Sequence, residues 1–330
     1  MNMFDRLGTR RAPRSRVRTS GARPPRGLLV AGTAVAVLAS LLAGSATQAA
    51  IRPDHAMRRA SAAAIGATRK PPDRIISLSP TATEMLYAIG AGRQVVAVDE
   101  DSDYPADAPR TKLSGLEPNI EAIARYNPDL VVVSYNPEGF VKSLAALGVP
   151  VLLEPSATDL SGTYAQIEAL GRVTGHAGRA AALVRRMRAE IAVAIAGAPR
   201  FSPPETYYFE LETDFYSVTS STYVGQLLKM FGLRNIADAA KGASSGYPQL
   251  SDEYIVKADP RIIFLADTIC CRQSARTVAA RPGWGNVAAV RDGAVVGLND
   301  DIASRWGPRV VVLTRDIEAA LWRIKRHRGA

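Results

Sequence analysis

Residues 242–246 read GASSG, which is the spacing of a nucleophile elbow and would present Ser244 for acyl transfer. That motif needs a strand before the serine and a helix after it. Here a helical pattern precedes the motif, and Tyr247-Pro248 follow it. A nucleophilic serine also needs a histidine base, but none of the chain's histidines is placed to serve. There are three of them: His55, His176 and His327. We therefore predict no catalytic residue and no enzyme.

The scarcity of histidine also argues against a bare Zn²⁺ or Mn²⁺ site, because such sites depend on imidazole ligands. The sequence contains neither a phosphate-binding loop nor a dinucleotide fingerprint. We therefore expect no metal site formed by the protein and no cofactor.

A second pattern occurs twice. Residues 119–131 read NIEAIARYNPDLV, and residues 251–263 read SDEYIVKADPRII. In each copy a residue suited to cap a helix is followed two places later by Glu121 or Glu253, and a proline and an apolar run come after. The pattern predicts a short helix, a stop and a buried strand. One half of the chain therefore repeats the other, with an acid in the first turn of each helix.

Cys270 and Cys271 are adjacent, just after a predicted strand that ends at Ala266. Neighbouring Cα atoms are about 3.8 Å apart, which is below the usual range for a disulfide. The sequence leaves three states open: a vicinal disulfide in an oxidising envelope, two free thiols, or thiolates that coordinate the metal of a ligand.

The elements that must position these residues alternate between strands and helices. In the first half we predict strands at 74–78, 95–98, 130–134 and 149–153, with helices at 81–89 and 139–147. Helices only are predicted from 160 to 197, with a break at Gly175-His176. In the second half we predict strands at 206–211, 261–266 and 294–298, and helices at 223–231, 252–257, 274–280 and from 308 onward. The predicted fold is α/β, with two parallel-sheet lobes joined by one long α-helix.

The basic charge of the chain, 41 Lys and Arg against 31 Asp and Glu, comes mostly from its start. Residues 1–49 hold eight arginines and one acid, and the remainder is nearly balanced, so nucleic acid is not an expected partner. An uncharged run at 27–51 with a small-residue ending follows these arginines and predicts an export signal over 1–49. Retention as a membrane anchor is the alternative, and the export route stays open. Ser45 stands where a lipidated cysteine would be needed, so no lipid is expected there. Residues 50–72 are predicted to be a disordered tether.

Several segments together resemble the helical-backbone class of substrate-binding proteins for ABC importers, whose members bind ferric siderophores, cobalamin or haem. The resemblance covers about residues 74–320. It is carried by RIISLSPTATEMLYAIGAG, DSDYP, GLEPNIEAIARYNPDLVVVS, LLKMFGLRNIAD, YPQLSDEYIVKADPRIIFLAD and SRWGPR. It implies a binding domain over 74–330, divided into an N-lobe (74–155), linking helices (160–197) and a C-lobe (203–330). It also implies that Glu121 and Glu253 dock onto arginines of a membrane permease; a simple interaction of each acid with its helix dipole is the alternative.

The resemblance places the ligand between the lobes, beyond the carboxyl ends of the strands. Ser79 and Thr81 lie at the start of a helix there, and Asp103 and Asn136 lie in neighbouring loops. Aromatic and cationic side chains in the same region suit a large flat chelate. The expected ligand-binding residues are Ser79, Thr81, Tyr104, Tyr135, Tyr216, Tyr223, Tyr247, Arg305, Trp306 and Arg309. The alternative is that several of these tyrosines are core or rim residues.

We therefore predict an exported binding protein, on the periplasmic or outer side of the membrane, that delivers a metal chelate to an ABC permease. A ferric siderophore ranks first, cobalamin second and haem third, and a monomer is expected. A non-transport binding or signalling module of the envelope on the same fold is the alternative.

Overall fold

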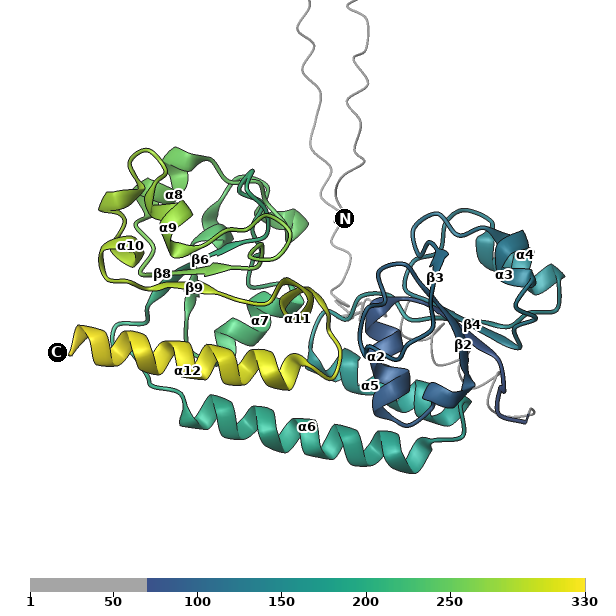
Figure 1. Cartoon of the computed structure of the whole chain (residues 1–330). Helices are drawn as coiled ribbons and strands as arrows, with labels where there is room; N and C mark the ends of the chain where they lie inside the picture. Colours follow the sequence, from purple (N-terminus) through teal and green to yellow (C-terminus); the bar gives the residue numbers. More distant parts are fainter. Residues whose placement is uncertain (1–69, 330) are drawn as a thin grey trace, which may run out of the picture. The chain divides into compact units, whose positions relative to one another are not determined.

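The β-branched runs that read as buried strands form two parallel sheets in the computed structural model, which describes residues 70–329 (Figure 1). These residues all belong to one structural unit. The first sheet has the strand order β3-β2-β1-β4-β5, and the second has the order β7-β6-β8-β9. All neighbouring strands pair in parallel, and β1, β4 and β8 are buried along their whole length. Helices therefore cover both faces of each sheet.

The first sheet and its helices form the N-lobe. Its strands are β1 (Ile75–Leu78), β2 (Val95–Asp99), β3 (Arg110–Leu113), β4 (Leu130–Val133) and β5 (Val151–Leu153). Its helices are α2 (Pro80–Ala88), α3 (Ile120–Ala124) and α4 (Phe140–Ala146). The register of β1 against β4 is unbroken, from Ile75 opposite Leu130 to Leu78 opposite Val133.

The second sheet and its helices form the C-lobe. Its strands are β6 (Thr206–Glu210), β7 (Arg234–Asn235), β8 (Ile262–Leu265) and β9 (Val295–Gly297). Its helices are α7 (Tyr223–Met230), α8 (Asp252–Ala258), α9 (Ala275–Ala279), α10 (Ala288–Arg291), α11 (Asp300–Ser304) and α12 (Val310–Arg328). Aromatic side chains fill this core: Tyr207 and Phe264 meet edge to face, with ring centroids 6.0 Å apart.

Two helices without an intervening strand connect the sheets. They are α5 (Leu160–Val173), which packs on α2, and α6 (Ala177–Gly197), which lies along α12 (Figure 1). The Asp159 side chain caps α5 by accepting from the Gly162 N–H, and Gly175 adopts a positive φ in the turn between the helices. The linking segment is thus two helices, of which α6 is the longer.

The elements that the sequence did not predict are short. β3 has one buried residue, β7 spans two residues, and α10 and α11 span four and five. Such segments carry too few apolar residues to show a period. Lys70–Pro72, assigned to the tether by sequence, are described: Pro72 is buried and its carbonyl accepts from Gln94 Nε2 at 2.6 Å.

The predicted export signal (1–49), Ser45 and the remaining tether lie outside the described residues. Of the helices within 70–329, none combines the length and the apolar character needed to cross a bilayer.

Candidate functional site

Both arginines of the SRWGPR segment bind Glu84 of α2. Arg309 donates to both carboxylate oxygens, from Nη2 at 2.6 Å and from Nε at 3.0 Å. Arg305 Nη1 donates to the same carboxylate at 3.1 Å. The Glu84 side chain is only 1% exposed, and three charge-assisted hydrogen bonds from the two arginines offset the cost of its burial. These contacts fix the segment between α11 and α12 on the first helix of the N-lobe.

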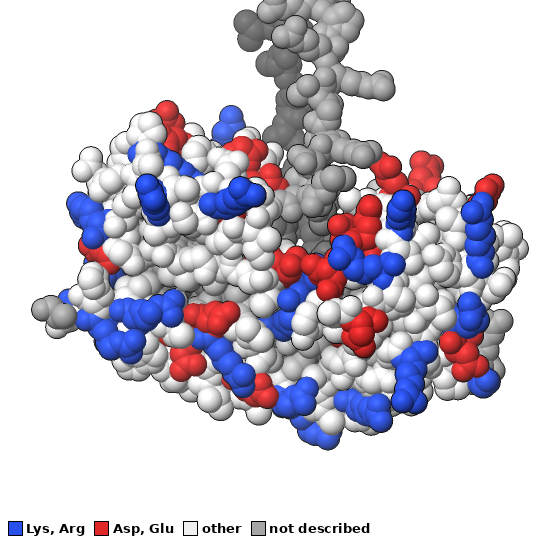
Figure 2. Space-filling model, viewed as in Figure 1, with Lys and Arg blue, Asp and Glu red and all other residues white. Residues whose placement is uncertain are grey.

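Arg305 is shared among further acids. Its Nη1 donates to Asp103 at 2.8 Å, and its Nη2 donates to Asp301 at 3.0 Å and to the Asp101 carbonyl at 3.1 Å. Burial opposes the charge of Arg305, but Asp301, Asp103 and Glu84 outweigh it, and the pKa of Arg305 is raised. Acidic and basic side chains adjoin in the middle of the face seen in Figure 2. We call Glu84, Asp103, Asp301, Arg305 and Arg309 the interlobe ion cluster.

Two aromatic side chains adjoin this cluster. The Arg309 guanidinium lies over the Tyr104 ring, 4.4 Å from its centroid, while Tyr104 remains 47% exposed. Trp306 is half-buried and is fixed on α5: its Nε1 donates to Gln166 Oε1 at 2.9 Å, and its carbonyl accepts from Thr163 Oγ1 at 2.9 Å. Trp306 is therefore held in place on α5, whereas the ring of Tyr104 remains partly open to solvent.

The other expected ligand residues differ in exposure: two tyrosines are exposed, one is half-buried and three residues are buried. Tyr135, after β4, and Tyr247 are 53% and 47% exposed. Tyr216 is half-buried and forms an isolated antiparallel bridge with Gln249, close in sequence to Tyr247. Within residues 70–329, the hydrogen bonds and ion pairs of the interlobe ion cluster do not include Tyr135.

Three expected residues are buried. Ser79 accepts the Ala82 N–H at 3.3 Å as the cap of α2, and Thr81, which is 3% exposed, lies beneath Gly307. Tyr223 lies in the hydrophobic core, and burial raises its pKa. We leave these three out of the proposed ligand surface, because their side chains are already enclosed by the protein.

The two repeated helix starts have the caps that the sequence indicated. Asn119 accepts the Ala122 N–H at 2.9 Å, and Ser251 accepts the Tyr254 N–H at 3.1 Å. Glu121 and Glu253 are exposed. The backbone N–H of Glu253 and the Ser251 hydroxyl lower the pKa of Glu253, which favours its ionised form.

The structure joins Cys270 to Cys271 in a disulfide, with Cα atoms 3.8 Å apart. The pair lies in the loop that follows β8, and Asp300 of α11 accepts the Cys270 N–H at 2.8 Å. Within residues 70–329 no group of three or more His, Cys, Asp or Glu side chains is arranged to hold a metal ion.

Sequence reasoning missed Glu84, Gln166 and Asp301. Glu84 had one visible signal, because it is an acid in a short helix whose neighbours Met85 and Leu86 are both apolar and buried. Its partners Arg305 and Arg309 lie more than two hundred residues away in the chain, so no local pattern could reveal the pairing.

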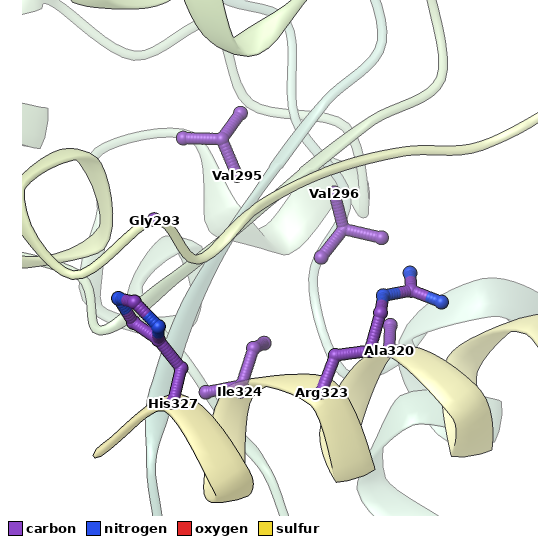
Figure 3. A pocket seen from close by; sticks show the side chains of 7 residues that line it. All are labelled: Gly293, Val295, Val296, Ala320, Arg323, Ile324 and His327. Atoms are coloured by element: carbon purple, nitrogen blue, oxygen red, sulfur yellow. The ribbon is translucent and has the colours of Figure 1, made fainter. Parts of the chain in front are cut away.

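A small pocket of about 260 Å³ lies between β9 and α12 (Figure 3). Its lining residues are Gly293, Val295, Val296, Ala320, Arg323, Ile324 and His327. None of them belongs to the expected ligand set, so this pocket is not the candidate ligand site.

The GASSG segment forms a 3₁₀ turn at Ala243–Ser245, preceded by another 3₁₀ turn at Ile236–Ala239. A nucleophile elbow joins a strand to a helix, so the described geometry differs from that motif.

Comparison with known proteins gives the chain a family. The family model described as periplasmic binding protein matches residues 75–302. A cobalamin-binding protein of Halobacterium salinarum is 32% identical over 250 residues, covering 73% of this chain and 67% of that protein. An ABC transporter substrate-binding lipoprotein of Bacillus subtilis is 28% identical over 263 residues, covering 77% and 81%.

Among solved structures, the periplasmic vitamin B12-binding protein of Vibrio cholerae has a TM-score of 0.63 and 26% identity, covering 77% of this chain and 98% of that one. This likeness confirms the predicted fold of two parallel-sheet lobes with a helical connection. The matched family model, the relatives and the two-sheet architecture agree, and the chain belongs to the periplasmic binding protein family.

Proposed function

We propose that this protein binds a cobalamin-type cobalt corrinoid outside the cytoplasmic membrane and delivers it to the permease of an ABC importer. The observation that carries the choice of ligand is the charge balance of the interlobe ion cluster. Both arginines of the SRWGPR segment already have carboxylate partners within 3.1 Å.

A ferric catecholate siderophore is strongly anionic and requires cations that have no other partner. In the interlobe ion cluster three carboxylates outnumber two guanidinium groups, so the local charge does not favour an anion. Cyanocobalamin has no net charge, and its rim of amide groups can accept and donate hydrogen bonds. The cluster therefore fits a neutral ligand better, and cobalamin moves ahead of an anionic ferric siderophore of the catecholate class.

The exposed tyrosines support the same ligand class. Tyr104 and Tyr247 are each 47% exposed, and Tyr135 is 53% exposed. Each provides an apolar ring and a hydroxyl, which suits a macrocycle with a polar rim. The relatives named as cobalamin-binding and vitamin B12-binding proteins add support.

The test is a tryptophan-fluorescence titration with cyanocobalamin, a ferric catecholate siderophore and haemin, corrected for light absorbed by each ligand. We expect saturable quenching at micromolar or lower concentration with cyanocobalamin only. Tight binding of the siderophore or of haemin, with no response to cyanocobalamin, would refute the corrinoid assignment.

Trp306 offers an internal check on where the ligand binds. It lies beside the interlobe ion cluster, whereas Trp284 is fully buried in the C-lobe. Trp306→Phe should remove most of the quenching, with Trp322→Phe on α12 as the matched control. Equal quenching by cyanocobalamin in the two variants would show that the ligand does not bind next to Trp306.

The delivery step rests on Glu121 and Glu253, one in each lobe. Both are exposed in the first turn of a capped helix, so they can meet cations of a permease without reorganising the fold. Replacing either with Ala should reduce corrinoid uptake by cells at least tenfold while the affinity for cyanocobalamin stays unchanged. Glu138→Ala, at an exposed acid before α4, is the control that should leave uptake intact.

A further inference from the structure

The loop after β8 presents an apolar tip to solvent. Ile269 is 57% exposed, and beside it the linked Cys270 and Cys271 are exposed and half-buried. An isoleucine and a disulfide together form an apolar surface with neither charge nor hydrogen-bonding capacity of the side chains. We call residues Thr268–Cys271 the disulfide loop.

One side chain holds most of the disulfide loop in place. The Asp300 carboxylate accepts three successive backbone N–H groups, from Thr268 at 2.8 Å, Ile269 at 2.9 Å and Cys270 at 2.8 Å. The Thr268 hydroxyl also donates to Asp300 at 3.0 Å. A loop tied in this way loses little conformational entropy when something binds to it.

The backbone of Asp267 and the disulfide complete this restraint. The Asp267 carbonyl accepts the N–H groups of Cys271 and Gln273, at 3.3 and 3.2 Å. The Cys270–Cys271 bond closes a small ring that contains a single peptide bond, so the backbone between the two residues has little freedom.

The disulfide loop and the interlobe ion cluster share one helical turn. Asp300, which holds the loop, is followed in α11 by Asp301, which binds Arg305 at 3.0 Å. Arg305 in turn binds Asp103, the neighbour of Tyr104, at 2.8 Å. The loop also follows the carboxyl end of a parallel strand, where ligands of such sheets bind. Adjacent residues of α11 therefore tie the loop and the interlobe ion cluster together.

We propose that the disulfide loop is an apolar contact surface for the bound corrinoid, and that an intact Cys270–Cys271 bond is required for full affinity. This inference rests on the proposed function. A dithiol reductant would convert the bond to two thiols, each sulfur gaining one hydrogen, while the reductant becomes a disulfide. The loop backbone then gains freedom that ligand binding must remove again, which weakens binding.

The experiment compares three forms of the full chain: the oxidised protein, the reduced protein and the variant C270S/C271S. The reduced protein is prepared with a dithiol, which is then removed under anaerobic conditions. Each is titrated with cyanocobalamin. We expect the dissociation constant to rise about tenfold in the reduced protein and in the double variant. Ile269→Ala should raise it about fivefold by removing apolar contact. Val193→Ala, at a 72% exposed position on α6, is the matched control and should leave it unchanged.

A protection measurement separates contact from a merely structural role. Saturating cyanocobalamin should slow the reduction of the disulfide severalfold, as followed by alkylation and mass spectrometry, because the ligand covers it. Equal affinity of the oxidised and reduced proteins, or reduction that proceeds equally fast with and without bound ligand, would overturn this inference alone. Failure of the oxidised protein to bind cyanocobalamin would overturn the proposed function and this inference with it.

Discussion

Two carboxylate–arginine pairs in this molecule each form two hydrogen bonds but have different surroundings. Glu84 accepts from Arg309 Nη2 and Nε at 2.6 and 3.0 Å, and Glu210 accepts from Arg281 Nη1 and Nη2 at 2.6 and 2.5 Å. Glu84 receives a second arginine, whereas Glu210 lies against a second acid, Asp267. The first pair is therefore electrostatically satisfied, while the second contains two acids for one arginine.

The acids next to the two pairs differ in their exposure to water. The additional acids of the interlobe ion cluster, Asp103 and Asp301, have side chains that are 41% and 37% exposed to water. Asp267 is fully buried, and burial together with the Glu210 carboxylate raises its pKa to about 8. Burial and the neighbouring carboxylate therefore both favour the protonated form of Asp267. The interlobe ion cluster is partly open to water, whereas Glu210 and Asp267 lie in the C-lobe core.

Removing Glu210 should produce the largest effect. Glu210→Ala leaves the Arg281 guanidinium, 15% exposed, without its buried partner, and we expect the free energy of unfolding to fall by about 3–5 kcal/mol. Glu84→Ala also removes the carboxylate partner of Arg309, but that guanidinium still lies over the partly exposed Tyr104 ring and Arg305 keeps Asp103 and Asp301, so we expect a smaller loss of about 2 kcal/mol. Urea unfolding followed by circular dichroism measures both.

A double-mutant cycle with Arg281→Met isolates the pairing from the loss of packing. If Glu210 acts through Arg281, the double variant should be more stable than Glu210→Ala alone. If Glu84→Ala lowered the free energy of unfolding as much as Glu210→Ala does, the surroundings of the two pairs would not affect their contribution to stability.

The pH dependence of stability separates the lobes further. Asp267 in the C-lobe has its pKa raised to about 8, and Asp99 at the end of β2 has its pKa raised to about 6 by burial, against a hydrogen bond from Ser102. In each case the folded state holds a proton that the unfolded chain releases near pH 3.8, so stability falls as pH rises between these values, by at most about 1.4 kcal/mol per pH unit.

Unfolding experiments from pH 4 to 9 test this with one variant for each acid. Asp267→Asn should reduce the slope between pH 4 and 6, where Asp99 still contributes, and remove it between pH 6 and 8. Asp99→Asn should reduce the slope only between pH 4 and 6. Above pH 8 neither acid contributes a further slope. An Asp267→Asn variant that keeps the wild-type slope between pH 6 and 8 would show that Asp267 is ionised at neutral pH.

Some of these features could be predicted from the sequence and others could not. The β-branched runs at Leu130–Val133 and Ile262–Leu265 revealed both sheets, and the repeated caps at Asn119 and Ser251 revealed two matched helix starts. Those signals are local. The pairing of Glu84 with Arg309 is set by the folded arrangement of distant segments, and the burial of Tyr223 depends on core packing. Neither leaves a pattern in neighbouring residues.

The smallest predicted effect concerns the two matched caps. Asn119→Ala and Ser251→Ala each remove one hydrogen bond to a backbone N–H, so each should lower the free energy of unfolding by about 1 kcal/mol. The variants should differ in a second property. The Ser251 hydroxyl also lowers the pKa of Glu253, so Ser251→Ala should raise that pKa toward its ordinary value, as measured by an NMR titration of the Glu253 carboxyl.

If Asn119→Ala shifted the Glu253 pKa as much as Ser251→Ala does, the effect would come from general loosening of the fold rather than from the cap. If neither variant shifted it, the backbone N–H of Glu253 alone would account for the lowered pKa. The expected asymmetry would mean that the C-lobe cap does two things: it begins α8, and it lowers the pKa of the glutamate proposed to contact the permease. Repetition of a motif in the two halves of the chain would then conserve the helix start while the electrostatics around each glutamate differ.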